Sequence, residues 1–250
     1  MKLLTPGSIL GLGNVLEVNI LGEQKVCSFD CVYCNLGPTA KRLGKIKESV
    51  DFPIADHIVT SVAHELSSRR QQPKQQTMLF GLLISGNGEP TLHPDFENIM
   101  KGLVATRNEL MPTLKILVMT NGDSLDDREI VRALNLADER IVKLDVATED
   151  SFRSFNKPLS RTKLEKVIRG AKQLKDCIVQ AAVSSIPDAL NSKHLDDWLE
   201  VVGLIAPKNV YLHSVDIEGQ TTDRDEVLRV AHLLERRAKF KALLSSENVA

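Results

Sequence analysis

Six short apolar runs alternate with amphipathic segments along the 250-residue chain, and this alternation constrains the fold more than any other feature. The runs are rich in Val, Ile and Leu, which is typical of buried strands, and lie at 15–21, 78–85, 114–120, 140–146, 177–185 and 209–215. The segments between and after them predict helices at roughly 54–68, 95–107, 126–136, 161–175, 192–204 and 223–243. Strand and helix in alternation predict a parallel sheet covered by helices. Periodicity alone leaves open whether the sheet is doubly wound or forms a complete or partial barrel.

Composition sets the broad class of the protein. Hydrophobic residues make up 42% and charged residues 26% of the chain, which predicts one soluble domain over 1–250 with a core of about 14–220. The net charge of −1 and the 4% aromatic content argue against a dedicated nucleic-acid binder. The sequence contains neither a continuous signal-peptide core nor an apolar window long enough to span a membrane. We therefore expect no membrane association and a cytoplasmic location, where thiols stay reduced.

Polar and glycine-rich stretches follow the predicted strands, at the edge where parallel sheets collect function. They are CSFDCVYC (27–34), SGNGEP (85–90), TNGDS (120–124), DVATED (145–150) and HSVDIEG (213–219). The first of them holds three of the four cysteines of the chain in the spacing C-x3-C-x2-C. Reduced, clustered cysteines indicate metal ligands or reactive groups rather than disulfides.

The missing fourth ligand separates the possible metal sites. A structural zinc site takes four ligands, so Cys177 or a distant histidine would have to complete it. Cys177 opens the fifth predicted strand, which places it at the opposite end of the sheet, where a buried structural role is expected. An iron–sulfur cubane held by three thiolates leaves one iron open to a ligand, whereas four-cysteine clusters mainly transfer electrons. Three thiolates therefore favour a catalytic cluster.

These residues resemble the radical S-adenosylmethionine (SAM) superfamily. The motif is Cys27-x3-Cys31-x2-Cys34 with Tyr33 before the last cysteine, and Gly86-Asn87-Gly88-Glu89-Pro90 resembles the Gly-Gly-Glu-Pro segment of the family, with Asn87 splitting the glycines. The resemblance implies a partial (β/α)6 TIM barrel with the cluster loop after the first strand. It also implies a [4Fe–4S] cluster on the three cysteines and SAM as the second cofactor. In that chemistry SAM is cleaved reductively, and the 5′-deoxyadenosyl radical removes hydrogen from a substrate.

The resemblance also suggests cofactor-binding residues. Glu89 is expected to accept a hydrogen bond from the ammonium of SAM, with Gly86 and Gly88 allowing close backbone approach. The remaining candidates are Tyr33 near the adenine, Thr120 and Asn121 at the methionine or ribose, and His213, Ser184 and Ser185 at the ribose or adenine. Each has a structural alternative, such as an Asn121-Gly122 turn or a core histidine.

Two charged residues on the fourth predicted strand are candidates for the catalytic site. Lys143 and Asp145 lie two apart, so both point to one face of the sheet. Charges on a buried strand are costly unless they are paired or functional. They therefore either line the site or neutralise each other at the end of the strand.

A closer resemblance links the chain to small proteins related to the wyosine-forming tRNA enzymes. It is carried by Cys31-Val32-Tyr33-Cys34-Asn35-Leu36-Gly37, by Val142-Lys143-Leu144-Asp145 and by Phe155-Asn156-Lys157-Pro158. Those enzymes hold a second cluster on three further cysteines, but here only Cys177 is left. A tRNA base is the leading expectation for the substrate, and a small metabolite or a peptide is the alternative. The basic group Lys41, Arg42, Lys45 and Lys47 follows the cysteine loop and is placed to face an anionic substrate.

Electrons are expected from a separate low-potential donor of the flavodoxin or ferredoxin type, because the chain carries no flavodoxin domain. Two alternatives from other classes stay open at this point. One is a four-iron protein that only transfers electrons, which needs a fourth nearby cysteine. The other is a zinc-stapled binding module.

Overall fold

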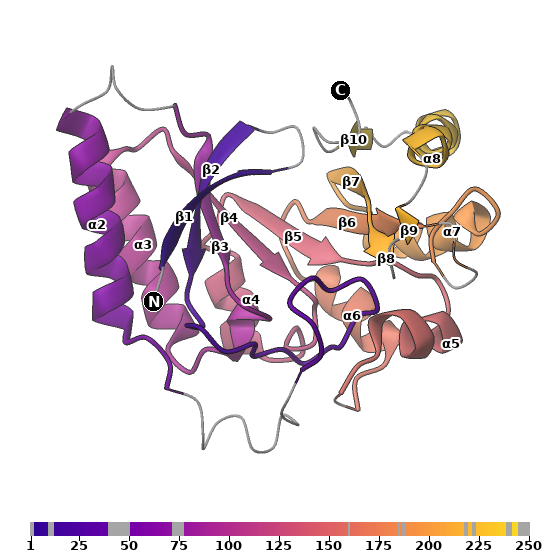
Figure 1. Ribbon diagram of the computed structural model, residues 1–250, viewed down its shortest axis with the longest axis horizontal. Helices are drawn as coiled ribbons and strands as arrows, with labels where there is room; N and C mark the ends of the chain where they lie inside the picture. Colours follow the sequence, from indigo (N-terminus) through magenta and orange to yellow (C-terminus); the bar gives the residue numbers. More distant parts are fainter. Residues whose placement is uncertain are drawn as a thin grey trace.

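The computed structural model describes residues 3–9, 13–39, 51–71, 78–159, 161–184, 186, 189–217, 220–221, 224–238 and 242–244. Eight strands form one sheet in the order β1-β2-β3-β4-β5-β6-β7-β10 (Figure 1). They are β1 (Leu4–Ile9), β2 (Gly13–Asn19), β3 (Gly81–Ser85), β4 (Lys115–Thr120), β5 (Glu139–Lys143), β6 (Ile178–Val183), β7 (Asn209–Ser214) and β10 (Ala242–Leu244). A two-stranded ribbon follows β7, formed by β8 (Asp216–Ile217) and β9 (Gln220–Thr221).

The helices of the described part connect these strands on the outside of the sheet. The α-helices are α2 (Ala55–Gln71), α3 (Phe96–Leu110), α4 (Arg128–Leu134), α5 (Glu149–Ser151), α6 (Leu164–Ala171), α7 (Leu195–Ile205) and α8 (Arg224–Ala238). A 3-10 turn, η2 (Pro90–Leu92), precedes α3, and a π-helical turn, η3 (Phe152–Asn156), continues α5. None of the described helices is both long and apolar enough to cross a membrane.

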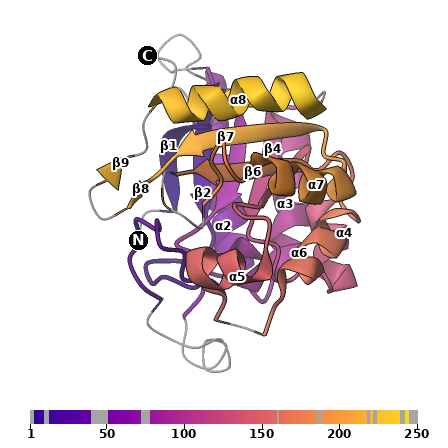
Figure 2. The same cartoon turned by 90° about the vertical axis from the view of Figure 1, so that its right-hand side faces the viewer.

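The six predicted strands are confirmed as β2 to β7, which pair in parallel with their neighbours in chain order. The sheet curls into a half barrel with the helices along its outer face (Figures 1 and 2). The structure therefore confirms the partial TIM barrel and decides against the doubly wound sheet that periodicity left open. In this arrangement the loops after β2 to β7 meet at one edge.

Burial differs on the two faces of the sheet. The outer face packs against the helices in one large core, in which Leu16 and Val18 of β2 and Ile58, Val62 and Leu66 of α2 are almost fully buried. The inner face has a small core made of strand residues, one from each parallel strand: Val15, Leu83, Leu117, Ile141, Ile178 and Tyr211. This apolar layer fills the barrel floor. The chemistry is therefore confined to the carboxyl end.

Three features differ from the sequence-based expectation. β1 is an additional antiparallel strand that pairs with β2, Thr5 opposite Glu17. The last helix was predicted over 223–243, but α8 ends at Ala238 and β10 follows, parallel to β7. The run predicted as a strand over 140–146 ends at Lys143, so Asp145 lies just beyond β5.

Candidate functional site

The cysteine loop follows β2 and is held on one side by the loop after β3. The Val26 N–H donates to the Asn87 carbonyl oxygen at 2.7 Å, and the Glu89 N–H donates to the Val26 carbonyl oxygen at 2.8 Å. Gly88 lies between these bonds with φ +133°, and a Cβ there would overlap the Val26 carbonyl. A glycine is required at this position because it allows both the conformation and the contact. Gly88 thus allows the backbone to approach the cysteine loop closely, and the expected close approach to SAM stays a prediction.

Asn87, the residue that splits the two glycines, ties down the entrance of the same loop. Its Nδ2 donates to the Gly22 carbonyl oxygen at 2.8 Å and to the Glu23 carbonyl oxygen at 3.2 Å. Asn19 supports it from the end of β2, because its Oδ1 accepts from the Asn87 N–H at 3.3 Å. The departure from the Gly-Gly spacing therefore adds a side-chain contact to the cluster loop.

The other side of the cysteine loop rests on the segment that follows β5. Phe29 and Pro158 form an antiparallel bridge, and the Val32 N–H donates to the Phe155 carbonyl oxygen at 2.9 Å. The Asp30 N–H donates to the Asn156 carbonyl oxygen at 3.2 Å. Two distant segments thus clamp the loop by backbone pairing.

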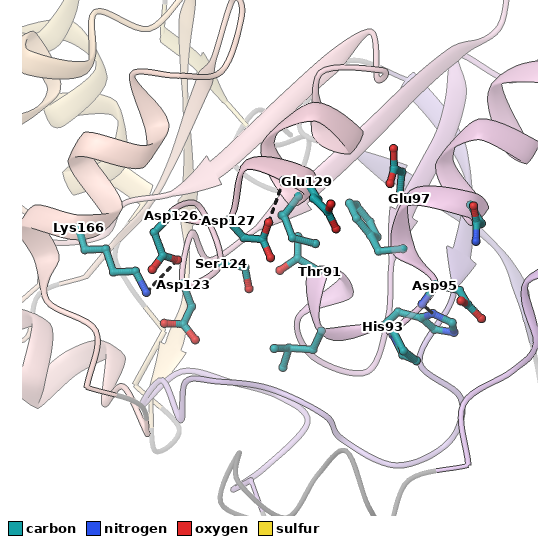
Figure 3. A pocket seen from close by; sticks show the side chains of 15 residues that line it. Thr91, His93, Asp95, Glu97, Asp123, Ser124, Asp126, Asp127, Glu129 and Lys166 are labelled. Carbon is teal, nitrogen blue, oxygen red and sulfur yellow. Dashed lines mark hydrogen bonds and ion pairs between the residues drawn. The ribbon is translucent and has the colours of Figure 1, made fainter.

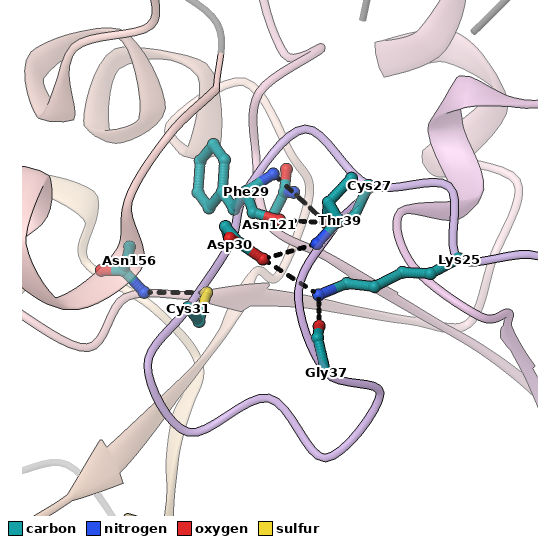
Figure 4. Close-up of polar contacts among 9 residues, drawn as sticks. All are labelled: Lys25, Cys27, Phe29, Asp30, Cys31, Gly37, Thr39, Asn121 and Asn156. Carbon is teal, nitrogen blue, oxygen red and sulfur yellow. Dashed lines mark hydrogen bonds and ion pairs between the residues drawn. The ribbon is translucent and has the colours of Figure 1, made fainter. Parts of the chain in front are cut away.

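A charged side chain braces the loop internally (Figure 4). Lys25 Nζ lies 3.4 Å from Asp30 Oδ1 and donates to the Gly37 carbonyl oxygen, and its side chain is only 9% exposed. Asp30 Oδ1 also accepts from the Thr39 N–H at 2.8 Å. Lys25 therefore joins the two ends of the segment that carries the three cysteines.

The three loop cysteines are half-buried and free. Cys27 Sγ accepts from the Phe29 N–H at 3.5 Å and from Asn121 Nδ2 at 3.7 Å, and Cys31 Sγ accepts from Asn156 Nδ2 at 3.5 Å. Burial raises the pKa of the Cys27 thiol to about 12 and that of Cys31 to about 11. A metal that binds these thiols must therefore displace their protons.

Glu89 is a buried hub between the ends of β3 and β4. Its Oε1 accepts from the hydroxyls of Thr91 at 2.6 Å and Thr120 at 2.7 Å, and its Oε2 accepts from the Asn121 N–H at 2.7 Å. Burial of Glu89, which is 2% exposed, raises its pKa despite these bonds. Oε2 accepts only one hydrogen bond and therefore has a further acceptor position. The expected bond from the ammonium of SAM to this carboxylate stays a prediction.

Thr120 and Asn121 connect this hub to the cysteine loop. Besides its bond to Cys27, Asn121 Nδ2 donates to Ser28 Oγ at 2.9 Å, and both Thr120 and Asn121 are at most 9% exposed. The Asn-Gly turn named as the structural alternative is also present, since Gly122 has φ +83°. The bonds made here are to the protein. Contact with a cofactor stays a prediction.

A second network joins Tyr33 to the ends of β5 and β7. Tyr33 Oη donates to Asp145 Oδ2 at 2.6 Å, Lys143 Nζ lies 3.2 Å from Asp145 Oδ1, and Lys143 Nζ donates to His213 Nε2 at 2.8 Å. Lys143 also lies over the Tyr33 ring, 5.1 Å from its centroid. The structure thus brings Tyr33 and His213, which the sequence analysis named separately, to the pair Lys143 and Asp145.

Charge in this second network is balanced. Burial opposes ionisation of Asp145, but Lys143, Tyr33 and Asn156 together hold its pKa below the usual range. Burial and the neighbouring Lys143 lower the pKa of His213 to about 3, so its ring is neutral. Lys143 and Asp145 therefore neutralise each other beside the cysteine loop, and their role in a catalytic site stays a prediction.

The remaining predicted residues lie at known places in the fold. Ser184 is 2% exposed, and its Oγ accepts from the Ile186 N–H at 3.4 Å in the loop after β6. Cys177 precedes β6 at the amino-terminal edge and is 4% exposed, as expected for a structural cysteine. Ser185 and the basic group at 41–47 lie outside the described residues.

Sequence reasoning assigned no role to Asn156. It donates both to Cys31 Sγ and, at 2.7 Å, to Asp145 Oδ2, and it ends the π-helical turn η3. The run Phe155–Pro158 was noted only as part of a resemblance. It could have been found as a site, because an asparagine that follows a strand end and lies two residues before Pro158 indicates a loop, where functional residues collect. Trp198 of α7 fixes the same region by donating to the Leu144 carbonyl oxygen at 2.9 Å.

A separate acidic pocket of about 460 Å³ lies between the starts of α3 and α4 (Figure 3). Its carboxylates serve local structure: Asp127 accepts from the Glu129 N–H at 2.8 Å and caps α4, and Asp126 pairs with Lys166 at 3.1 Å. Acidic residues near helix N-termini are favoured by the helix dipole. This pocket therefore needs no functional explanation.

The cysteine loop fits an iron–sulfur cluster. It offers three soft thiol ligands on one segment at the functional edge, with N–H donors directed at two of the sulfurs, and such bonds tune cluster potentials. Within the described residues, no three His, Cys, Asp or Glu side chains are grouped to hold a single metal ion. A cubane takes one thiolate per iron, so its ligands need not converge on one point. This geometry favours the cluster over the zinc alternative.

Fold and site together define the class of protein. Residues 24–205, which are 182 of the 250 residues, match the model of the radical SAM superfamily, and the chain belongs to that superfamily. Members of this superfamily use a [4Fe–4S] cluster and SAM.

Among curated proteins, the chain is similar to UPF0026 proteins. It is 29% identical over 206 residues to one from Synechocystis, covering 80% of this chain and 70% of that protein. It is 31% identical over 167 residues to one from Methanocaldococcus jannaschii, covering 66% of this chain and 47% of that protein.

Solved structures show the same fold. SuiB of Streptococcus suis bound to the precursor peptide SuiA superposes with a TM-score of 0.64 and 14% identity, over 89% of this chain and 47% of SuiB. An archaeal TYW1 superposes with a TM-score of 0.59 and 15% identity, over 91% of this chain and 73% of TYW1. The chain thus spans about half the length of SuiB. At these identities the likeness concerns the fold alone.

Proposed function

We propose that this protein is a radical SAM enzyme in which Cys27, Cys31 and Cys34 hold a [4Fe–4S] cluster. When bound, the cluster supplies the electron that cleaves SAM into methionine and the 5′-deoxyadenosyl radical, which takes a hydrogen atom from the substrate. The single observation that carries the proposal is the double clamp on the cysteine loop. Backbone pairing to the loop after β3 and to the segment after β5 fixes the three thiols at the functional edge of the barrel.

The residues around the loop have distinct roles in this proposal. Asn121 and Asn156 donate to the ligand sulfurs and stabilise their thiolate form. Glu89 keeps an acceptor position for the ammonium of SAM. Gly86 lets its backbone pack closely against Leu21 and Asn19, since a Cβ there would overlap Leu21. Burial within a barrel mouth excludes water and protects a radical from side reactions.

The second network supplies the far wall of the site. Lys143, Asp145 and His213 are fixed by one another, which gives a rigid, charge-balanced surface beside Tyr33. We assign the adenosine part of SAM to this wall, where Ser184 closes the loop after β6. A rigid wall of this kind orients the reacting carbon without the entropic cost of ordering side chains.

Enzymes of this superfamily need a reductant and a substrate. For this chain, an external flavodoxin- or ferredoxin-type donor stays a prediction, and so does a tRNA base or small molecule as substrate. SuiB, solved with a peptide, has this fold, and so does TYW1. The fold therefore accommodates a bound peptide in SuiB.

The test is anaerobic reconstitution with iron and sulfide, reduction with dithionite, and measurement of 5′-deoxyadenosine formed from SAM. The wild-type chain should become brown and form 5′-deoxyadenosine. Cys34→Ala should abolish the product, and Cys177→Ala serves as the matched control because this cysteine lies at the opposite edge of the sheet. Absence of product from wild-type protein with a full cluster would contradict the proposal.

A further inference from the structure

The inner face of the barrel has a second layer of side chains above the apolar floor. Successive residues of a strand alternate between faces, so the residue two positions beyond each member of the apolar layer faces the same interior. These residues form the polar layer: Glu17, Ser85, Met119, Lys143, Gln180 and His213. All but one of them can form hydrogen bonds, so the barrel presents polar groups beneath the cysteine loop.

The two charged residues of this polar layer have different surroundings. Lys143 is paired with Asp145 and hydrogen-bonded to His213. The side-chain carboxylate of Glu17, on β2, forms no hydrogen bond or ion pair with any described residue, and burial alone raises its pKa. A half-buried carboxylate without a partner costs free energy that a bound cation would recover.

Glu17 lines a cavity of about 350 Å³ at the β1 side of the barrel mouth, which we call the Glu17 cavity. Its polar lining comes from Thr5, Glu17, Asn19, Glu23, Ser85 and Asn87, and Gly22 and Gly86 complete it. None of these lining residues is basic, and two are carboxylates. The volume is at the small end of the range for ligand pockets, which suits one functional group rather than a whole cofactor.

β1 shapes this cavity. Thr5 pairs with Glu17 across the two strands, and a Cβ at Gly7 would overlap Glu17 Oε1. The glycine thus leaves space for the carboxylate to lie across β1. The extra strand that the sequence did not predict is therefore part of the cavity wall.

A second acceptor on the inner face is also unsatisfied. Gln180 of β6 is 5% exposed, and its Oε1 has no hydrogen-bond partner among the described residues. Its register neighbours are Lys143 and Tyr211. Buried polar atoms are nearly always paired, so an orphan acceptor indicates a donor that binds from outside the chain. The unpaired polar groups of Glu17 and Gln180 on the inner face are therefore both hydrogen-bond acceptors.

We propose that the Glu17 cavity binds a cationic nitrogen group of the substrate, an ammonium or a guanidinium, with Glu17 as its counter-ion. The inference rests on the proposed function, since it names the chemistry of that enzyme's substrate. A cation fits better than a neutral donor because the cavity holds two carboxylates and no base. Its place next to Gly86 and Asn87 lies beside the segment assigned to SAM, so a group anchored here holds the rest of the substrate near the radical.

The test uses small probes on the reconstituted full chain. Binding of n-butylammonium and methylguanidinium is measured by calorimetry and ligand-detected NMR, with n-butanol as the neutral probe. We expect a Kd for the cations on the order of 1 mM, and at least about tenfold weaker binding of butanol. Glu17→Gln should weaken cation binding about tenfold or more. Glu200→Gln, on the exposed side of α7, is the matched control and should leave it unchanged.

Gly7→Ala is the second variant, because it keeps the charge and displaces the Glu17 carboxylate. It should also weaken cation binding. The inference is overturned if neither cation binds at a concentration 20-fold above the expected Kd of ~1 mM. It is also overturned if butanol binds as tightly as the cations, or if Glu17→Gln weakens cation binding no more than Glu200→Gln does. Wild-type SAM cleavage is measured separately: cleavage without cation binding removes only this inference, and cation binding without cleavage removes only the proposed function.

Discussion

The substitution Gly88→Ala tests the contact between the loop after β3 and the cysteine loop. Gly88 has φ +133°, and an added Cβ would overlap the backbone carbonyl of Val26. A backbone carbonyl cannot move aside as a side chain can, so the two hydrogen bonds between Val26 and the loop after β3 must break. We expect the cysteine loop to detach from this side of its clamp.

The cost can be worked out from these contacts. Backbone strain in a glycine-only region contributes about 1–3 kcal/mol. The two lost hydrogen bonds add about 0.5–1.5 kcal/mol each, which gives roughly 2–6 kcal/mol in total. For a chain of this size each kcal/mol lowers Tm by about 2–4 °C, so we expect a fall of roughly 4–24 °C. Iron uptake during anaerobic reconstitution should fall as well.

Two glycines provide matched controls. Gly13 has φ +117°, but an added Cβ would meet only the Phe80 Cβ at 3.4 Å, so Gly13→Ala measures strain without overlap, about 1–3 kcal/mol. Gly203→Ala, in α7 with nothing within 4 Å, should raise stability by ~0.5–1 kcal/mol. Both controls should take up iron like the wild type. If Gly88→Ala melts no lower than Gly13→Ala and binds iron normally, the reasoning is wrong.

Three further predictions concern titration and the sulfur contacts. Because the pKa of His213 is lowered to about 3, the unfolded chain binds its proton first, so stability is lost as pH falls from about 6.5 towards 3; His213→Gln should remove roughly 2–4 kcal/mol of the loss between pH 7 and 4, measured by Tm, and an unchanged pH dependence in this variant would contradict the reasoning. Because burial raises the pKa of Cys27 and Cys31, the thiols should release protons when the cluster binds, and cluster uptake should become faster as pH rises from about 7 to 9. The proton release is measured with a pH indicator. Cluster uptake without proton release would contradict this prediction. Asn156→Ala removes a donor to Cys31 Sγ and should lower the cluster potential, measured by redox titration with EPR detection; an unchanged potential would show that this bond does not act on the cluster.

The sequence predicted the sheet well because its strands are buried on both faces. Runs such as 178–183 are buried at every position and apolar except for Gln180, so strand and helix alternate clearly. β1 was missed because LTPGSI carries Pro6 and Gly7, which are tolerated only at an edge strand. β10 was missed because helical periodicity continues past Ala238, and only pairing with β7 decides otherwise.

The sequence predicted those residues of the candidate site that belong to short local motifs. It did not predict the contacts between residues that are distant in the sequence. The three cysteines and Glu89 lie within short recognisable stretches. The bonds of Tyr33 to Asp145 and of Asn156 to Cys31 join residues more than a hundred positions apart, and periodicity carries no information on such pairs. Glu17 appeared as an ordinary strand residue because its lack of a partner is visible only in three dimensions.

The double clamp on the cysteine loop also bears on the order of assembly. Residues 26–32 are fixed by residues 87–89 and 155–158, so the ligand loop is synthesised early and gains its shape late. Contacts of such long sequence separation form after the entropic cost of closing the intervening chain has been met. An iron–sulfur carrier would thus find a receptive protein only once four of the six strands β2 to β7 had left the ribosome, and maturation in the cell would follow folding rather than guide it.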